Sequence, residues 1–142
     1  MRSTDAMAQE VMALQRGLDI LDRMVETMEE GALIEIYDIR TVLRYFRDFG
    51  SVYPQLTEER ELLSEIEGAL NPKHGIGFVR NSRRLILLIR NRLEKEEDEI
   101  IAAGFMTGRN LTDTHATFSR LERKYASKSR SAPAEMERRA HA

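Results

Sequence analysis

The chain has no cysteine and no tryptophan, and only three histidines and three prolines among its 142 residues. Without cysteine it has no disulfides, no thiolate metal ligands and no thiol nucleophile, and three histidines leave little room for an imidazole metal site. No apolar run reaches the roughly 18 residues of a membrane-spanning helix, and the first ten residues lack the apolar segment of a signal peptide. These absences predict a cytoplasmic protein that does not enter a membrane.

Neither sign of charge is in excess, because 22 lysines and arginines nearly balance 24 acidic residues, for a net charge of −2. This balance gives no general attraction to nucleic acid. Apolar residues make up 42% of the chain, and its length fits one domain with an ordinary core. We expect a single helical bundle over residues 4–126 and a flexible polar tail over residues 127–142.

Apolar residues recur at the three- and four-residue spacing of helices, and no segment alternates apolar and polar side chains as a strand does. We therefore expect an all-α fold, whose first helix ends at Gly31, a natural helix stop. The second helix is expected to begin near Glu35, and Pro54 either kinks it or divides it. A long continuous third helix is expected over residues 75–103, and a short fourth helix from Thr112.

Two acidic pairs lie inside the expected helices, in the segments PQLTEERELL and RLEKEEDEII. The first pair is Glu58-Glu59, and the second begins at Glu96. A side chain four residues earlier lies one helical turn away on the same face, and at these positions the chain has Gln55 and Arg92. This spacing is the one by which a helix presents two ligands to one metal ion.

These segments resemble the hemerythrin-like family, also described as HHE cation-binding domains. Residues 14–30 look like the family's first helix, and residues 42–63 look like the second, with its aromatic-rich stretch and its Glu-Glu pair. Residues 75–83 are a weaker match to the start of the third helix, and residues 87–101 look like the fourth. The resemblance implies an antiparallel four-helix bundle in which the third and fourth family helices are here fused into one long helix.

In this family, histidines from all four helices hold a non-haem di-iron centre, and the resemblance implies where they would stand. Gln15 stands at the first histidine position, Gln55 at one of a histidine pair, and Arg92 one turn before the final glutamate. Glutamine is a poor iron ligand and an arginine guanidinium stays protonated, so we expect no metal cofactor and no catalytic residues. The remnant of the site would then be Gln15, Gln55, Glu58, Glu59, Arg92 and Glu96.

The role of Arg92 has two interpretations. In the first, Arg92 joins Glu96 and either Glu58 or Glu59 in a network that replaces the charge of the metal. In the second, which is the more ordinary arrangement, Arg92 and Glu96 form an exposed i,i+4 pair. Because Glu96 lies on the apolar seam of its helix, we expect it to be the carboxylate that points inward, and the three acidic residues after it to face solvent.

The sequence thus predicts a non-enzymatic protein that has lost the di-iron site and serves as an assembly, regulatory or partner-binding module. The fused helix would leave one wall of the bundle open, to be closed by the fourth helix or by a second subunit, so a homodimer is expected. The basic residues between 73 and 95 are expected to be balanced by acidic neighbours and not to bind nucleic acid. Two alternatives stay open: a divergent sensor or store that binds iron or another divalent metal, and a small-molecule sensor that uses the vacated cavity.

Overall fold

A computed structural model describes residues 2–70, 75–105 and 111–125, and in these ranges the chain forms six helices and no strand. The labelled helices are α1 (Arg2–Glu29), α2 (Ile36–Val52), α3 (Thr57–Gly68), α4 (Gly75–Lys95) and α5 (Glu97–Phe105). The sixth, over residues 111–125, is termed the C-terminal helix. The predicted all-α class is confirmed, while the tail predicted over residues 127–142 lies outside the described residues. No described helix is long and apolar enough to cross a membrane.

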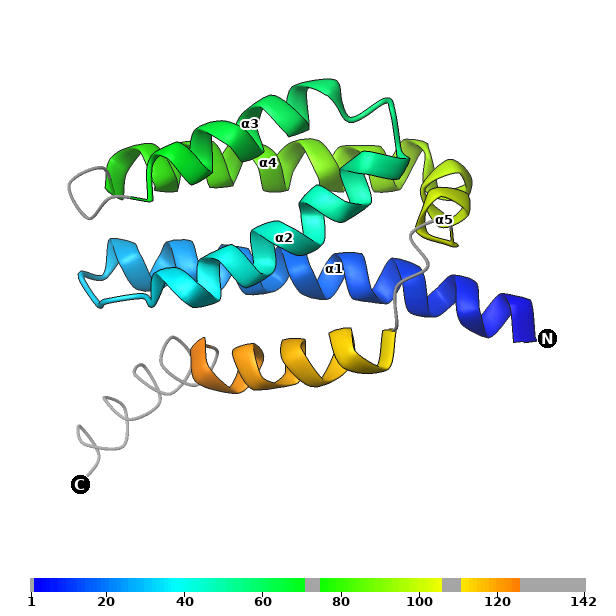
Figure 1. Cartoon of the computed structure of the whole chain (residues 1–142), viewed down its shortest axis with the longest axis horizontal. Coiled ribbons are helices and arrows are strands. Elements are labelled where there is room, and N and C mark those ends of the chain that lie inside the picture. The colour runs from blue at the N-terminus through cyan, green and yellow to red at the C-terminus, as the bar shows by residue number, and fades with distance from the viewer. Residues whose placement is uncertain (1, 71–74, 106–110, 126–142) are drawn as a thin grey trace, which may run out of the picture.

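The first four helices form an antiparallel ring (Figure 1). α1 packs against α2 and α4, and α3 packs against the same two helices. α5 crosses one end of the ring, where it contacts α1, α2 and α4. α3 supplies the wall that was expected to be open, so the ring closes within one chain. The argument for a homodimer from an incomplete bundle therefore does not apply, and a second subunit remains a prediction.

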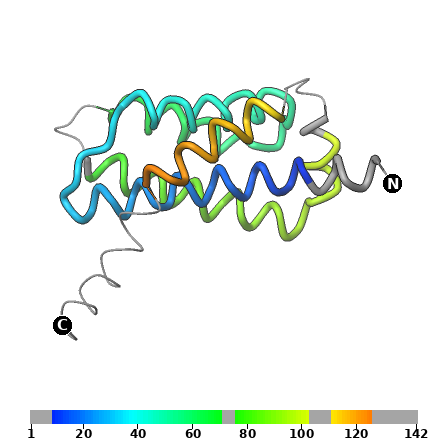
Figure 2. Tube along the Cα trace, turned by 90° about the horizontal axis from the view of Figure 1, so that it is seen from below, coloured from blue at the N-terminus to red at the C-terminus, as the bar shows by residue number. Residues whose placement is uncertain are grey.

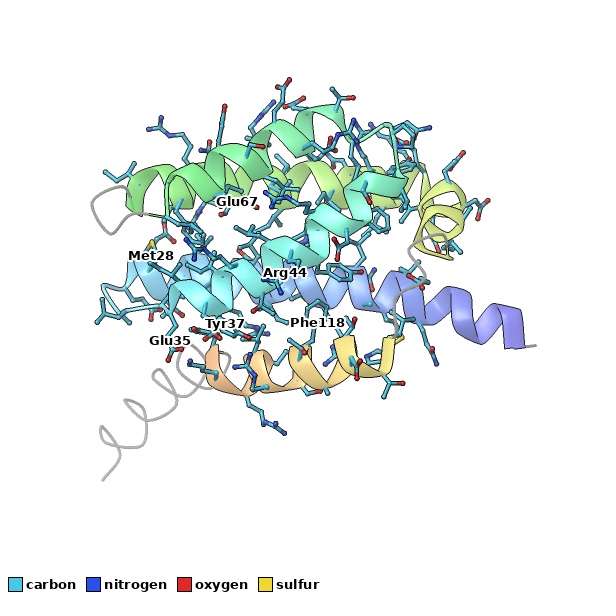
Figure 3. The ribbon with its side chains drawn as sticks, in the orientation of Figure 1. Met28, Glu35, Tyr37, Arg44, Glu67 and Phe118 are labelled. Carbon is cyan, nitrogen blue, oxygen red and sulfur yellow. The ribbon has the colours of Figure 1, made fainter. Side chains whose placement is uncertain are left out.

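The C-terminal helix lies along α1 and α2, on the side away from α3 and α4 (Figure 2). It is the short helix predicted to start from Thr112. Phe118 points from this helix toward α1 and α2 (Figure 3), and its ring meets that of Tyr45 edge to face at a centroid distance of 5.2 Å. From α1, the Arg16 guanidinium donates hydrogen bonds to both carboxylate oxygens of Glu122, at 2.7 and 2.9 Å. An aromatic contact and an ion pair thus attach the helix to the bundle.

Pro54 divides the second predicted helix, which is one of the two outcomes expected for it. α2 ends before Pro54 and α3 starts after it, because proline lacks the amide donor that would continue the helix. The guanidinium of Arg60 spans the break and donates to the carbonyl oxygens of Gly50 at 2.9 Å and Tyr53 at 3.3 Å. These bonds satisfy carbonyls that the end of a helix leaves without partners.

The prediction of one continuous helix over residues 75–103 is wrong, because Glu96 separates α4 from α5. Backbone bonds continue on both sides of the break, from the Glu96 amide to the Arg92 carbonyl at 2.6 Å and from the Ile100 amide to the Glu96 carbonyl at 3.0 Å. Arg92 and Lys95 occupy the last turn of α4, and three acidic residues occupy the first turn of α5. Each charge suits the dipole of its helix end, so a reversal of charge marks a boundary that the apolar spacing does not show.

Gly17 lets three aromatic rings approach α1 closely. A Cβ at this position would lie 3.2 Å from Cζ of Phe46, 3.4 Å from Cζ of Phe118 and 3.5 Å from Cδ2 of Tyr45. The closest of these distances is tighter than ordinary van der Waals contact, so a larger residue would displace the rings. Because Phe118 belongs to the C-terminal helix, the absence of a side chain at Gly17 allows that helix to pack closely against α1.

We expect Gly17→Val to lower the free energy of unfolding by about 1–3 kcal/mol, through overpacking of this aromatic cluster. The matched control is Gly68→Val, because a Cβ at Gly68 would have no neighbour within 4 Å; its effect should stay within about 0.5 kcal/mol. Urea denaturation measures both. Equal effects at the two glycines would contradict the packing described for Gly17.

Candidate functional site: a buried arginine–carboxylate network

An ion-pair network joins α3, α4 and the break before α5. The Arg92 guanidinium donates from Nε to Oε2 of Glu59 and from Nη1 to Oε2 of Glu96, the latter at 3.2 Å. The hydroxyl of Tyr53, in the turn after α2, donates to Oε1 of Glu96. These four residues are termed the Arg92 network. Arg92 thus forms the i,i+4 pair with Glu96 and also the contact with Glu59 that the first interpretation expected. That this network replaces the charge of a metal stays a prediction.

Glu59 is the most buried carboxylate of the network, although Glu96 was expected to be. Glu96 is half-buried, and the three acidic residues after it are exposed, as expected. Glu59 is 1% exposed, while the side chains of Arg92 and Glu96 retain 26% and 31%. Glu96 occupies the bend between two helices, which leaves its side chain close to the surface. The sequence carried a signal for Glu59, because it begins the buried stripe of α3 that continues with Leu62, Leu63 and Ile66 at helical spacing.

The two hydrogen-bond donors of the network, Arg92 and Tyr53, keep their protons at neutral pH. The hydrogen bond to Glu59 raises the pKa of Arg92 although burial opposes it. Burial raises the pKa of Tyr53, and its hydrogen bond to Glu96 raises it further, so the phenol stays a donor. Oε1 of Glu59 is buried and has no hydrogen-bond partner among the described residues. The guanidinium of the network therefore stays charged, and its phenol stays protonated, near neutral pH.

The other three predicted site residues lie away from the network. Glu58 is exposed and pairs with Arg84 at 2.5 Å. Gln55 is exposed in the turn that precedes α3. Gln15 is exposed on α1, where it lines a groove of about 490 Å³ between α1 and α4 together with Arg90. Within the described ranges, no group of three or more His, Asp or Glu side chains is arranged to hold a metal ion.

The basic stretch of α4 is balanced by acidic side chains of its neighbours, as expected. Arg83 pairs with Glu29 of α1, and Arg90 pairs with Asp19 of α1 at 2.9 Å. On the other side, Arg84 pairs with α3. These exposed pairs contribute little to stability, but they neutralise the face of α4 that would otherwise carry a run of positive charge.

A second buried carboxylate, Asp38, was missed by the sequence analysis. It lies in the first turn of α2 with 1% exposure. Its Oδ2 accepts hydrogen bonds from the Tyr125 hydroxyl at 2.6 Å and from Nζ of Lys124 at 2.8 Å, and its Oδ1 lies 3.4 Å from Arg120. All three donors come from the C-terminal helix. An acidic residue in a first turn is ordinary, so no local signal indicated these partners more than 80 positions away.

These contacts shift two pKa values in opposite directions. Burial alone would raise the pKa of Asp38, but the hydrogen bonds from Lys124 and Tyr125 outweigh burial and hold this pKa below its usual range. Burial and the hydrogen bond to Asp38 raise the pKa of Tyr125 to about 12. The carboxylate therefore stays charged and the phenol stays protonated from about pH 4 to about pH 10.

We expect Arg92→Met to lower the free energy of unfolding by about 3–5 kcal/mol, because it leaves the buried Glu59 carboxylate without its cation. Methionine retains most of the apolar stem, which limits the loss of packing. The matched control is Arg84→Met, which breaks an exposed pair on the same helix and should cost about 1 kcal/mol or less. Urea denaturation measures both, and a small loss for Arg92→Met would contradict the network.

We expect Asp38→Asn to reduce the loss of stability in acid. Because the pKa of Asp38 is lower in the folded state, its contribution is present above the unfolded pKa of about 3.9 and is lost as the pH falls through the folded pKa. The stability difference between wild type and Asp38→Asn should therefore shrink between about pH 5 and pH 2. Asp98→Asn, at an exposed position, should run parallel to wild type. A difference for Asp38→Asn that does not change with pH would contradict this assignment.

Comparison with known proteins assigns the chain to no family. No family model matches it, and neither the curated proteins nor the solved structures contain a significant match. The likeness to the hemerythrin-like family thus rests on the residues quoted from the sequence. The function has to be argued from the site itself, since a helical bundle alone does not determine it.

Proposed function

We propose that this protein is a hemerythrin-like bundle that has lost the di-iron site and acts without catalysis, as an assembly, regulatory or partner-binding module. The observation that carries the proposal is the position of Arg92. It stands where the resemblance expects a histidine, and it contacts Glu59 and Glu96, two of the carboxylates that the resemblance assigns to the metal site. Its guanidinium supplies a fixed positive charge between carboxylates that a metal ion would otherwise neutralise.

The donor set of the network does not fit a di-iron centre. A guanidinium has no lone pair to offer a metal, and it already occupies Oε2 of both Glu59 and Glu96. The remaining oxygen of Glu96 accepts from Tyr53. A metal ion would have to displace Arg92 and leave that cation without its partners inside the bundle, which is costly.

The guanidinium at the centre of the network stays charged and is held by two carboxylates, which favours a structural role over an enzymatic one. What remains for function is the outer surface of the bundle, which a protein partner recognises by shape, apolar contact and charge. We propose that the protein works in the cytoplasm, as a homodimer that presents this surface to a further protein partner.

We expect the protein, purified without affinity metal or chelator and dialysed after exposure to excess iron(II) or manganese(II), to retain less than about a tenth of a metal atom per chain. Inductively coupled plasma mass spectrometry gives this value. The control is Glu96→Gln, which should retain the same trace amount if that metal is adventitious. One or two iron or manganese atoms per chain in wild type, reduced in Glu96→Gln, would overturn the proposal.

A further inference from the structure

Exposed apolar side chains gather at one end of the bundle, where the loop between α1 and α2 lies beside the start of α4 (Figure 1). Leu33 is 93% exposed, Ile76 77%, Tyr37 69% and Ile36 37%. Met28 and Tyr37 lie at this end in Figure 3. Single exposed apolar residues are common, but a cluster of them marks an interaction surface. These four exposed residues, with the pocket that Leu33 and Ile36 help to line, are termed the apolar end.

The pocket at the apolar end has a volume of about 290 Å³, and the described side chains that line it are all apolar. Met28, Ile39 and Phe78 contribute to its walls, and Leu33 and Ile36 also border it. Small-molecule pockets span roughly 300–1,000 Å³ and orient their ligands with a few polar groups. This pocket falls just below that range, and among the described residues no polar side chain lines it, so we expect it to suit an apolar side chain of a protein better than a small molecule.

We propose that the apolar end docks onto the same end of a second copy of the chain, with Leu33 of each copy inserted into the pocket of the other. A two-fold interface requires one surface to contain both members of each contact. The apolar end meets this requirement, because a projecting leucine stands directly beside a cavity lined with apolar side chains. Each insertion would remove apolar surface from water in both copies.

In this two-fold arrangement, an acidic side chain of each copy would face a basic side chain of the other. Glu30 is exposed next to the loop that carries Leu33, and Arg80 is exposed on α4 one helical turn after Ile76, on the same face of the helix. Neither side chain has a partner among the described residues. Insertion of Leu33 into the second copy would bring Glu30 toward the partner's α4, and the two-fold axis would repeat this contact.

The proposed contact centres on one inserted leucine per copy, whereas a standard interface covers about 800 Å² on each partner. We therefore expect a dissociation constant in the micromolar range. This inference names the surface of the homodimer proposed above, but it does not depend on the metal content of the protein. A metal-free monomer would overturn this inference and the proposed homodimer but not the proposed loss of the di-iron site, and a metal-loaded dimer would overturn only that loss.

Sedimentation velocity of the full chain, from about 1 to about 100 µM, tests the inference. Wild type should shift from monomer to dimer over this range, and Leu33→Asp should weaken the dimer at least about tenfold, because it places a charge in an apolar pocket. Leu33 is almost fully exposed in the monomer, so the variant should keep its circular dichroism and its melting temperature. The matched control is Leu87→Asp, at a 57% exposed leucine in the middle of α4, which should dimerise like wild type.

A second pair of variants tests the orientation of the two copies. Glu30→Arg and Arg80→Glu should each weaken the dimer, and the variant that carries both changes should recover most of the wild-type affinity. A wild type that stays monomeric over the whole range would overturn the inference and leave the apolar end to a different partner. Dimerisation that Leu33→Asp does not weaken, or that Leu87→Asp weakens equally, would also overturn it.

Discussion

A carboxylate on the buried face of a helix must be paired or protonated before that helix can pack, and Glu59 occupies such a position on α3. The cost of removing this charge from water is several kcal/mol unless a cation and hydrogen-bond donors replace the lost hydration. α4 meets this requirement by placing Arg92 opposite Glu59. Because α3 and α4 run antiparallel (Figure 1), this one contact fixes which residues of the two helices face each other along their whole length.

The same contact connects the two interruptions of the chain. Tyr53 comes from the turn that Pro54 creates, and Glu96 is the residue at which α4 bends into α5. Both side chains meet beside Arg92, so the ends of α2 and α4 are held together by one set of hydrogen bonds. From that point α5 crosses the end of the bundle and covers it. A buried charge in this place therefore specifies the arrangement of the helices more than it adds to net stability.

Patterns within single helices predicted much of the fold from the sequence. The apolar seam of α1 and its stop at Gly31 follow from spacing and from a glycine that adopts a φ of 85°, in the left-handed region. The C-terminal helix followed from its apolar face. The bend at Glu96 was not predicted, because the apolar spacing continues through it and only the sign of the charges reverses there.

The site was predicted less well, because its contacts join distant helices. The candidates Arg92, Glu59 and Glu96 do meet, whereas Gln15 and Gln55 face solvent elsewhere. Position on one seam favoured Glu96 as the inward carboxylate, but burial depends on what the neighbouring helices cover, which spacing within one helix does not reveal. The partners of Asp38 were out of reach for the same reason, since they lie on a helix that begins more than 70 positions later.

The contact between Arg92 and the buried Glu59 is central to the packing of the bundle, and the proposed loss of metal binding rests on it as well. A double-mutant cycle measures that contact most directly, with Arg92→Met, Glu59→Gln and the variant that combines them, each followed by urea denaturation. We predict a coupling energy of about 2–3 kcal/mol, as found for residues that share a buried network. A coupling energy below about 0.5 kcal/mol, the value typical of independent sites, would contradict the account.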